Sequence, residues 1–203
     1  MSSVKTRPII HINGFPGTGK LTIARLLQSK LGGNKHCRMI HNHLLINPAD
    51  AVLRRTEPGY RHLRKSIRSA VFTTLISNEA THDIVYIFTD FQSSDLMGSA
   101  TCAEYLEMSE ARGCALISVI LSCEEEVNAV RLRSAERLAH GKIVDEELLR
   151  GFRADLTVHR FDFASGNGTE LELDVTHLTA EEAAQAVYEH VLRLYPEMKQ
   201  GPT

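Results

Sequence analysis

The sequence has 203 residues, of which 43% are hydrophobic and 24% charged, and its formal net charge is −2. A chain of this length and composition buries enough apolar surface for one well-formed core, which excludes a disordered protein, a collagen-like repeat and a small disulfide scaffold. The nearly balanced charge gives no reason to expect nucleic acid or a membrane as the main partner, and the longest apolar run, residues 115–121, is far too short to span a bilayer.

Short β-rich runs alternate with longer helical patterns, which is typical of a parallel sheet covered by helices. The expected strands, in chain order, are residues 9–13, 38–42, 84–89, 115–121 and 171–175. The expected helices are residues 20–31, 60–77, 95–112, 123–139 and 180–194. Ser122 with Glu125, and Thr179 with Glu182, have the capping-box spacing that marks helix starts. We predict one three-layer α/β domain over residues 1–203.

Two polar stretches, residues 44–78 and 131–163, fall outside this alternation and are interpreted as insertions at one sheet edge. In an open parallel sheet the ligand crevice lies beyond the carboxyl ends of the strands, so such insertions are placed to cover a substrate. The four cysteines form no CxxC pair, and no long apolar leader precedes the first strand. We therefore expect a cytoplasmic protein without a structural zinc site, either a monomer or a homodimer.

The strongest motif runs from Gly14 to Lys20 (GFPGTGK) and fits G-x-x-x-x-G-K between an expected strand and an expected helix. Glycines let successive backbone N–H groups point at a phosphate, and the lysine reaches the β- and γ-phosphates of a nucleotide. The alternative is a glycine-rich turn with an incidental lysine. We predict nucleotide binding by the following residues: Gly14, Gly17, Thr18, Gly19, Lys20, Leu21 and Thr22.

Leu21 departs from the motif, which has Ser or Thr after the lysine, where its hydroxyl binds Mg²⁺. Thr22 lies about 100° further round the helix and is no simple substitute. If the protein is an enzyme, Mg²⁺ must be held by nucleotide oxygens, water and a carboxylate elsewhere. A protein with leucine at this position retains nucleotide binding more easily than it retains catalysis.

The combination GFPGTGKLT, HNHLLI and IFTDFQSSD resembles the small P-loop kinases, a superfamily that includes adenylate and shikimate kinases, chloramphenicol phosphotransferases and tunicamycin-resistance proteins. It is also similar to a group of fungal and bacterial P-loop proteins with GKLT in the loop. The resemblance implies a five-stranded parallel sheet in the order 2-3-1-4-5 with a lid over residues 131–163. It also implies that Thr22 lies near the α-phosphate and that Arg131 and Arg137 in the lid contact the transferring phosphates. The alternative for these arginines is surface ion pairing.

Asp90 ends an apolar run and is expected beside the phosphate loop, where it would hold Mg²⁺ or accept a proton from the acceptor. It could also simply begin a loop. His43 is a second candidate for the base, and Asn42 for an acceptor contact, at a turn where related kinases present an Asp. With His41 and Cys37 this turn could instead form a metal site, or it is purely structural.

Arg64 and Arg68 lie on one cationic face of the expected helix at residues 60–77. This face is either solvated or, as in nucleoside monophosphate kinases, anchors the acceptor, with Gln92 as a further hydrogen-bonding group. A small-molecule acceptor that bears a phosphate or carboxylate fits the second interpretation.

The residues together favour an ATP-dependent kinase that uses Mg²⁺ and transfers the γ-phosphoryl group to a small polar acceptor, a hydroxyl compound or a nucleoside monophosphate. Lys20, Asp90, Arg131 and Arg137 are its expected catalytic residues. The alternative is an ATP-binding protein without phosphotransfer, such as a sensor or a resistance protein, which Leu21 and the missing acid near His43 favour.

Overall fold

Five parallel strands form the centre of the protein, whose computed structural model describes residues 6–132, 146–163, 166 and 168–199. The strands lie in the order β2-β3-β1-β4-β5, and every neighbouring pair is parallel. Their bounds are β1 Ile9–Asn13, β2 Cys37–His41, β3 Val85–Thr89, β4 Leu116–Ser122 and β5 Gly168–Asp174. The expected parallel sheet and its strand order are confirmed.

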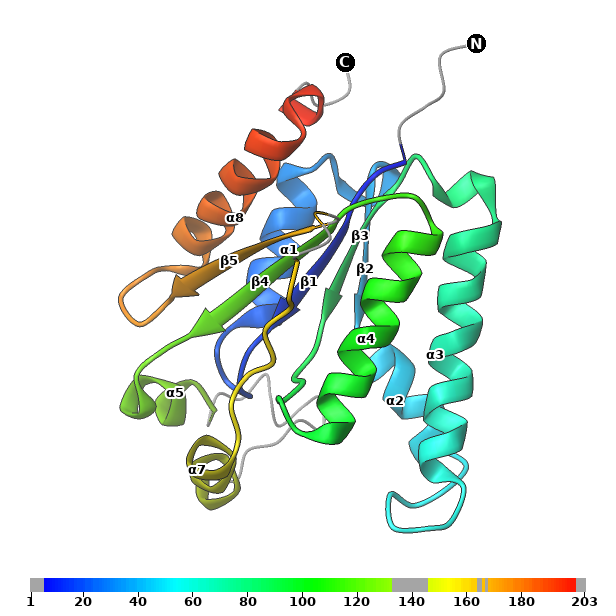
Figure 1. Ribbon diagram of the computed structural model, residues 1–203. Coiled ribbons are helices and arrows are strands. Elements are labelled where there is room, and N and C mark those ends of the chain that lie inside the picture. The colour runs from blue at the N-terminus through cyan, green and yellow to red at the C-terminus, as the bar shows by residue number, and fades with distance from the viewer. Residues whose placement is uncertain (1–5, 133–145, 164–165, 167, 200–203) are drawn as a thin grey trace.

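Two pairs of helices cover the sheet, one on each face (Figure 1). α1 (Lys20–Lys30) and α8 (Ala180–Leu194) pack on one face, and α3 (Tyr60–Ser77) and α4 (Leu96–Ala111) on the other. Alternate residues of β1 divide between the two cores, since Ile10 and Ile12 face α1 while Ile9 faces the opposite layer. Short 3₁₀ turns occupy Gly33–Lys35, Glu79–Thr81 and Pro196–Lys199.

Local sequence signals explain where several helices begin. The hydroxyl of Thr179 accepts a hydrogen bond from the Glu182 backbone N–H, while the Glu182 carboxylate accepts one from the Thr179 N–H, so this predicted capping box is confirmed. The carboxylate of Asp95 caps α4 by accepting hydrogen bonds from the N–H groups of Met97 and Gly98. The predicted box at Ser122 is wrong, because Ser122 is the last residue of β4 and pairs with Asp174 of β5.

Three short helices stand beyond the carboxyl ends of the strands, at the end of the sheet to which the arrows point in Figure 1. They are α2 (His43–Asp50), α5 (Glu125–Leu132) and α7 (Glu146–Asp155). α2 and α7 were not expected from the sequence, because α2 contains Pro48 and α7 buries only Leu149. The part of the expected fourth helix after Leu132 lies outside the described residues. The polar stretches thus add helices at the predicted side of the sheet.

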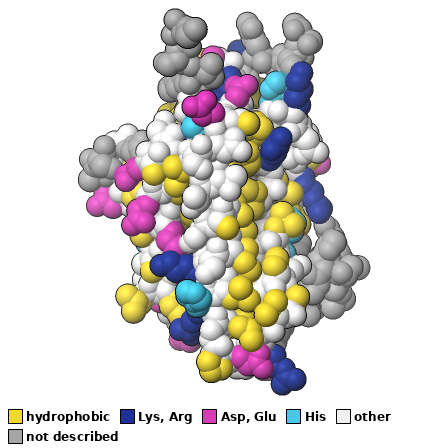
Figure 2. Space-filling view, turned by 90° about the vertical axis from the view of Figure 1, so that its right-hand side faces the viewer, with side chains coloured by type: hydrophobic (Ala, Val, Ile, Leu, Met, Phe, Trp, Pro, Cys, Tyr) yellow, Lys and Arg dark blue, Asp and Glu magenta, His cyan; other side chains and the backbone are white. Residues whose placement is uncertain are grey.

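The β2 edge of the sheet is only half covered. Met39 and Ile40 are partly buried, and no further strand pairs with β2 within the described residues. Figure 2 shows this side of the molecule, where hydrophobic side chains form a strip along the surface. No helix in the described part of the chain is both long and apolar enough to cross a membrane.

Candidate active site

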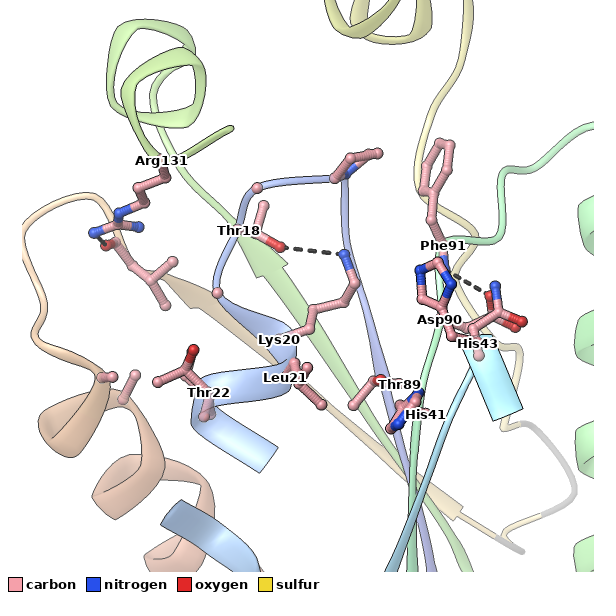
Figure 3. Close-up of a pocket in the computed structure, with 18 of the residues that line it drawn as sticks. Thr18, Lys20, Leu21, Thr22, His41, His43, Thr89, Asp90, Phe91 and Arg131 are labelled. Carbon is pink, nitrogen blue, oxygen red and sulfur yellow. Dashed lines mark hydrogen bonds between the residues drawn. The ribbon is translucent and has the colours of Figure 1, made fainter. Parts of the chain in front are cut away.

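A cavity of about 470 Å³ lies where the carboxyl ends of the strands meet the start of α1. This volume is in the range of pockets that bind small molecules. Two arms extend from its centre at Lys20 (Figure 3). One arm reaches Arg131, Thr22 and the start of α8, and the other reaches His41, His43, Asp90 and Phe91. The sheet order separates the two arms, since β2 and β5 form its opposite edges.

The predicted phosphate loop curls around the ammonium group of Lys20. Its Nζ donates hydrogen bonds to the carbonyl oxygens of Gly14 at 2.5 Å and Phe15 at 2.7 Å, and lies 3.4 Å from Oγ1 of Thr18. Gly17 and Gly19 have φ angles of 93° and 88°, the left-handed region that favours glycine. Gly19, the N-cap residue of α1, places no side chain over the start of this helix, and a helix N-terminus is a favourable position for an anion.

Residues 17–22, from Gly17 to Thr22, all line the cavity, whereas Gly14 lies behind it against β4. Leu21 points toward Thr89 and His41, while Thr22 points toward α8 (Figure 3). Leu21, the residue after the lysine, therefore presents an apolar side chain to the side of the cavity where Asp90 lies.

Asn128 and Arg153 support the phosphate loop from outside the cavity. The buried amide of Asn128 in α5 donates a 2.7 Å hydrogen bond to the carbonyl of Pro16. Arg153 in α7 donates to Oδ1 of Asn128 at 3.2 Å and to the carbonyl of Cys123 at 3.1 Å, and its guanidinium lies 5.3 Å from the centre of the Phe15 ring. The polar stretch after β4 thus packs directly against the loop.

Asp90 directly follows β3, which lies next to β1. It is only 3% exposed but still lines the cavity. One carboxylate oxygen accepts a 2.8 Å hydrogen bond from the N–H of Phe91, and the other accepts a 2.6 Å hydrogen bond from the amide of Gln92. Gln92 itself is not among the residues that line the cavity, so in this structure it orients Asp90.

Asn13 joins the loop that carries Asp90 to the phosphate loop. Its side-chain oxygen accepts hydrogen bonds from the N–H groups of Gly14 and Gln92, both at 2.9 Å. Its amide nitrogen donates to the carbonyl of Gln92, also at 2.9 Å. One buried side chain therefore fixes the spacing between the two loops.

His41, Asn42 and His43 line the arm on the β2 side. The two imidazole rings are 6.3 Å apart between centroids, and Nδ1 of His43 lies 3.3 Å from Oδ1 of Asn47. Burial raises the pKa of the Cys37 thiol to about 12, which disfavours a thiolate ligand. No group of three or more His, Cys, Asp or Glu residues that could hold a metal occurs in the described part of the chain.

Arg131 lies at the opposite arm. Its guanidinium donates to the carbonyl oxygens of Val175 at 2.9 Å and Thr176 at 3.4 Å, which holds it beside the start of α8. Arg137, the other expected lid arginine, lies outside the described residues.

Arg64 and Arg68 are not brought to the cavity in this structure. Arg68 is 8% exposed and forms an ion pair with Glu104 of α4, with its Nε 2.7 Å from the carboxylate. Arg64 acts electrostatically on Asp50 and Tyr60. The cationic residue that does line the cavity on this side is Arg55.

His11 is a buried polar residue that the sequence analysis did not single out. It is fully buried between Tyr105, 4.4 Å away between ring centroids, and Phe161. Neither ring nitrogen has a hydrogen-bond partner among the described residues. Burial lowers its pKa to about 4, an effect that Asp90 partly opposes.

No protein-family model matches this chain, and no curated protein matches its sequence. Solved structures share its fold. A sugar kinase from Janibacter is 17% identical with a TM-score of 0.62, and the match covers 96% of this chain and 99% of that one. An APS kinase from Mycobacterium tuberculosis is 16% identical with a TM-score of 0.58, covering 94% and 99%. A shikimate kinase from Acinetobacter baumannii is 19% identical with a TM-score of 0.57, covering 94% and 96%.

The chain therefore has the fold of the P-loop small-molecule kinases, as the sequence motifs predicted. The sheet order and the strand, glycine loop and helix that surround Lys20 define this class.

Proposed function

We propose that the protein is an ATP-dependent phosphotransferase that moves the γ-phosphoryl group to a small polar acceptor, either a hydroxyl compound or a nucleoside monophosphate. The observation that carries this proposal is that the glycine loop, with Lys20, and the carboxylate of Asp90 line one cavity. The solved structure of the APS kinase with the same fold is a complex with AMPPNP and APS, which supports the use of a nucleotide and a separate small acceptor.

In this reaction an acceptor oxygen forms a bond to the γ-phosphorus while the bond from that phosphorus to the β–γ bridging oxygen breaks, and ADP leaves. The N–H groups of residues 17–21 bind the β-phosphate, Lys20 extends to the γ-phosphate and Thr22 contacts the α-phosphate. Either Asp90, whose carboxylate Gln92 keeps oriented, or His43 accepts the proton of a hydroxyl acceptor. Arg131, and Arg137 from the lid, neutralise charge on the transferring group.

The residues present fit a Mg²⁺ ion bound largely through nucleotide oxygens and water. Mg²⁺ commonly takes only one or two protein carboxylates, and Asp90 supplies one at the cavity wall. When bound, the ion neutralises charge on the β- and γ-phosphates. Leu21 contributes no oxygen, so Asp90 is the residue that would hold the ion from this side.

Replacing Lys20 by methionine tests the proposal, with Lys30→Met at the exposed far end of α1 as the matched control. ATP binding is measured by isothermal titration, and turnover by coupled ADP release with a panel of polyols, sugars, sugar acids and nucleoside monophosphates. We expect Lys20→Met to lose ATP binding or turnover while Lys30→Met keeps both. Unchanged affinity and turnover in Lys20→Met would refute the proposal.

The apolar Leu21 favours a second function, an ATP-binding protein without phosphotransfer. Such a protein would bind ATP tightly, but none of the acceptors would stimulate ADP release. The same two measurements therefore separate the two functions.

A further inference from the structure

The segment between α2 and α3 carries a three-residue cluster of Asp50, Arg55 and Tyr60. Nε of Arg55 donates to Oδ1 of Asp50 at 3.2 Å, and Nη2 donates to Oδ2 at 2.8 Å. The hydroxyl of Tyr60, a buried side chain at the start of α3, donates to Oδ1 of the same carboxylate at 2.5 Å. These bonds, above all those from Arg55, hold the pKa of the Asp50 carboxyl below its usual value.

This cluster orients Arg55 more than it stabilises the fold. The side chains of Arg55 and Asp50 are 60% and 33% exposed, and an ion pair this accessible contributes at most about 1 kcal/mol to folding. The two-point contact nevertheless fixes the plane of the guanidinium. It uses Nε and Nη2, so Nη1 takes no part in the pair.

Arg55 lines the cavity, and its partner Asp50 is the last residue of α2, the helix that begins at His43 on the β2 side. Arg131 lines the opposite arm, on the far side of Lys20. Three of the four Lys, Arg, Asp or Glu side chains among the described lining residues are thus cationic, and they are spread along the cavity. A nucleotide whose phosphates are bound by Lys20 and Arg131 leaves Arg55 for a second ligand.

The neighbouring cations do not serve this arm. Arg68 is buried in its ion pair with Glu104, and neither Arg68 nor Arg64 lines the cavity. Among the described residues, Arg55 is the only lysine or arginine that lines the arm on the β2 side. Arg55 also lines a second hollow of about 520 Å³, formed with residues 56–59 and Arg61.

We propose that Arg55, held by Asp50 and Tyr60, binds an anionic group of the acceptor, a carboxylate or a phosphate, at the β2 side of the cavity. This inference rests on the proposed phosphotransferase function and assigns the charge class of the acceptor. A guanidinium presents paired N–H groups that can bind two oxygen atoms of either a carboxylate or a phosphate. The chemistry that the two anions share is therefore a pair of negatively charged oxygens on one atom. The reacting oxygen of that acceptor then lies between Arg55 and Lys20, on the side of Asp90.

The first test compares acceptors that are built on one carbon skeleton in each set and differ in charge: glycerol, glycerate and glycerol phosphate; glucose, gluconate and glucose 6-phosphate; adenosine and AMP. We expect ADP release with charged members only, and the carboxylate and phosphate sets show which anion is used. Arg55→Gln should raise KM for the charged acceptor about 10- to 100-fold, the range expected for a charge-assisted hydrogen bond, with KM for ATP unchanged. Arg54→Gln, one residue away and exposed, is the matched control and should change neither.

A second test needs no turnover. Wild-type protein saturated with AMPPNP is titrated with inorganic phosphate and with citrate at constant ionic strength, and each Kd should rise about tenfold or more in Arg55→Gln but not in Arg54→Gln. Tyr60→Phe weakens the cluster without removing the guanidinium, so it should raise each anion Kd by less than Arg55→Gln does.

Three results would overturn the inference alone: a neutral acceptor preferred over its charged partners, no anion binding to the AMPPNP-saturated protein, or a Kd change in Arg55→Gln no larger than in Arg54→Gln or Tyr60→Phe. None of these three results affects nucleotide binding, so the phosphotransferase proposal is then decided separately by the Lys20→Met experiment. A wild-type protein that binds no AMPPNP would remove both proposals together.

Discussion

Replacing Gly17 by alanine should harm the phosphate loop more than the same change at Gly19. Both residues have left-handed φ angles, and an L-residue in that conformation costs about 1–2 kcal/mol. At Gly19 the added Cβ would lie 3.7 Å from the nearest atom, Cδ1 of Ile23, so strain is the whole effect. At Gly17 it would lie 2.4 Å from Nδ2 of Asn128, which must move and give up its bond to Pro16. Unpairing these buried groups adds about 1–3 kcal/mol.

The assay is urea unfolding followed by far-UV circular dichroism, since the chain has no Trp to report by fluorescence. We expect Gly17→Ala to lower the free energy of unfolding by about 2–5 kcal/mol and Gly19→Ala by about 1–2 kcal/mol. In an Asn128→Ala background most of the difference between the two glycine variants should disappear. The remainder would come from the added Cβ at position 17, which lies 3.1 Å from the backbone oxygen of residue 128. Equal losses at the two glycines, or a difference that survives removal of the Asn128 side chain, would refute the reasoning.

Three further predictions follow from the site. His11 stays neutral in the folded protein down to about pH 4 but is protonated below about pH 6.5 when unfolded, so the free energy of unfolding should fall by about 3 kcal/mol between these pH values. Equilibrium unfolding across this range checks it, and an equally steep fall in His11→Phe would contradict the assignment to His11. Leu21→Thr should add a metal-binding hydroxyl and tighten Mn²⁺ binding by the ATP complex, measured by electron paramagnetic resonance; unchanged binding would mean that this position does not face the metal. Arg153→Gln should speed backbone hydrogen exchange in α7, measured by mass spectrometry, because it loses the bonds to Asn128 and Cys123; exchange equal to wild type would show that these bonds do not hold the helix.

The framework of the fold was predictable because its signals are local. Buried parallel strands are nearly continuous apolar runs, and the loop from Gly14 to Lys20 is specified by its glycines. The start of β5 was missed, since the strand begins at Gly168 and its polar Glu170 and Glu172 interrupt the apolar pattern. These glutamates form ion pairs with Arg160, so an edge strand carries charges that a central strand does not.

The cavity was only partly predictable. Lys20, Leu21 and Asp90 follow from position in a strand and a motif, and all three line it. Arg55 lies in an irregular segment, where no periodicity shows which side chain faces inward. Asn128 also acts through a contact 112 residues away in sequence, to the carbonyl of Pro16, and a long-range contact of this kind has no local signal. Arg68 has helical spacing like Arg64, but only the packed structure shows that Glu104 takes its charge.

The bridging amide of Asn13 has a consequence for motion. Its three hydrogen bonds tie the first residue of the glycine loop to the residues just after Asp90, so a shift of either segment strains the same contacts. The lysine-bearing and carboxylate-bearing segments should therefore rearrange as one unit, with a single exchange rate for both in NMR relaxation dispersion. Without the Asn13 amide, the segments that carry Lys20 and Asp90 would move independently of each other, even though Asn13 contacts neither charged group.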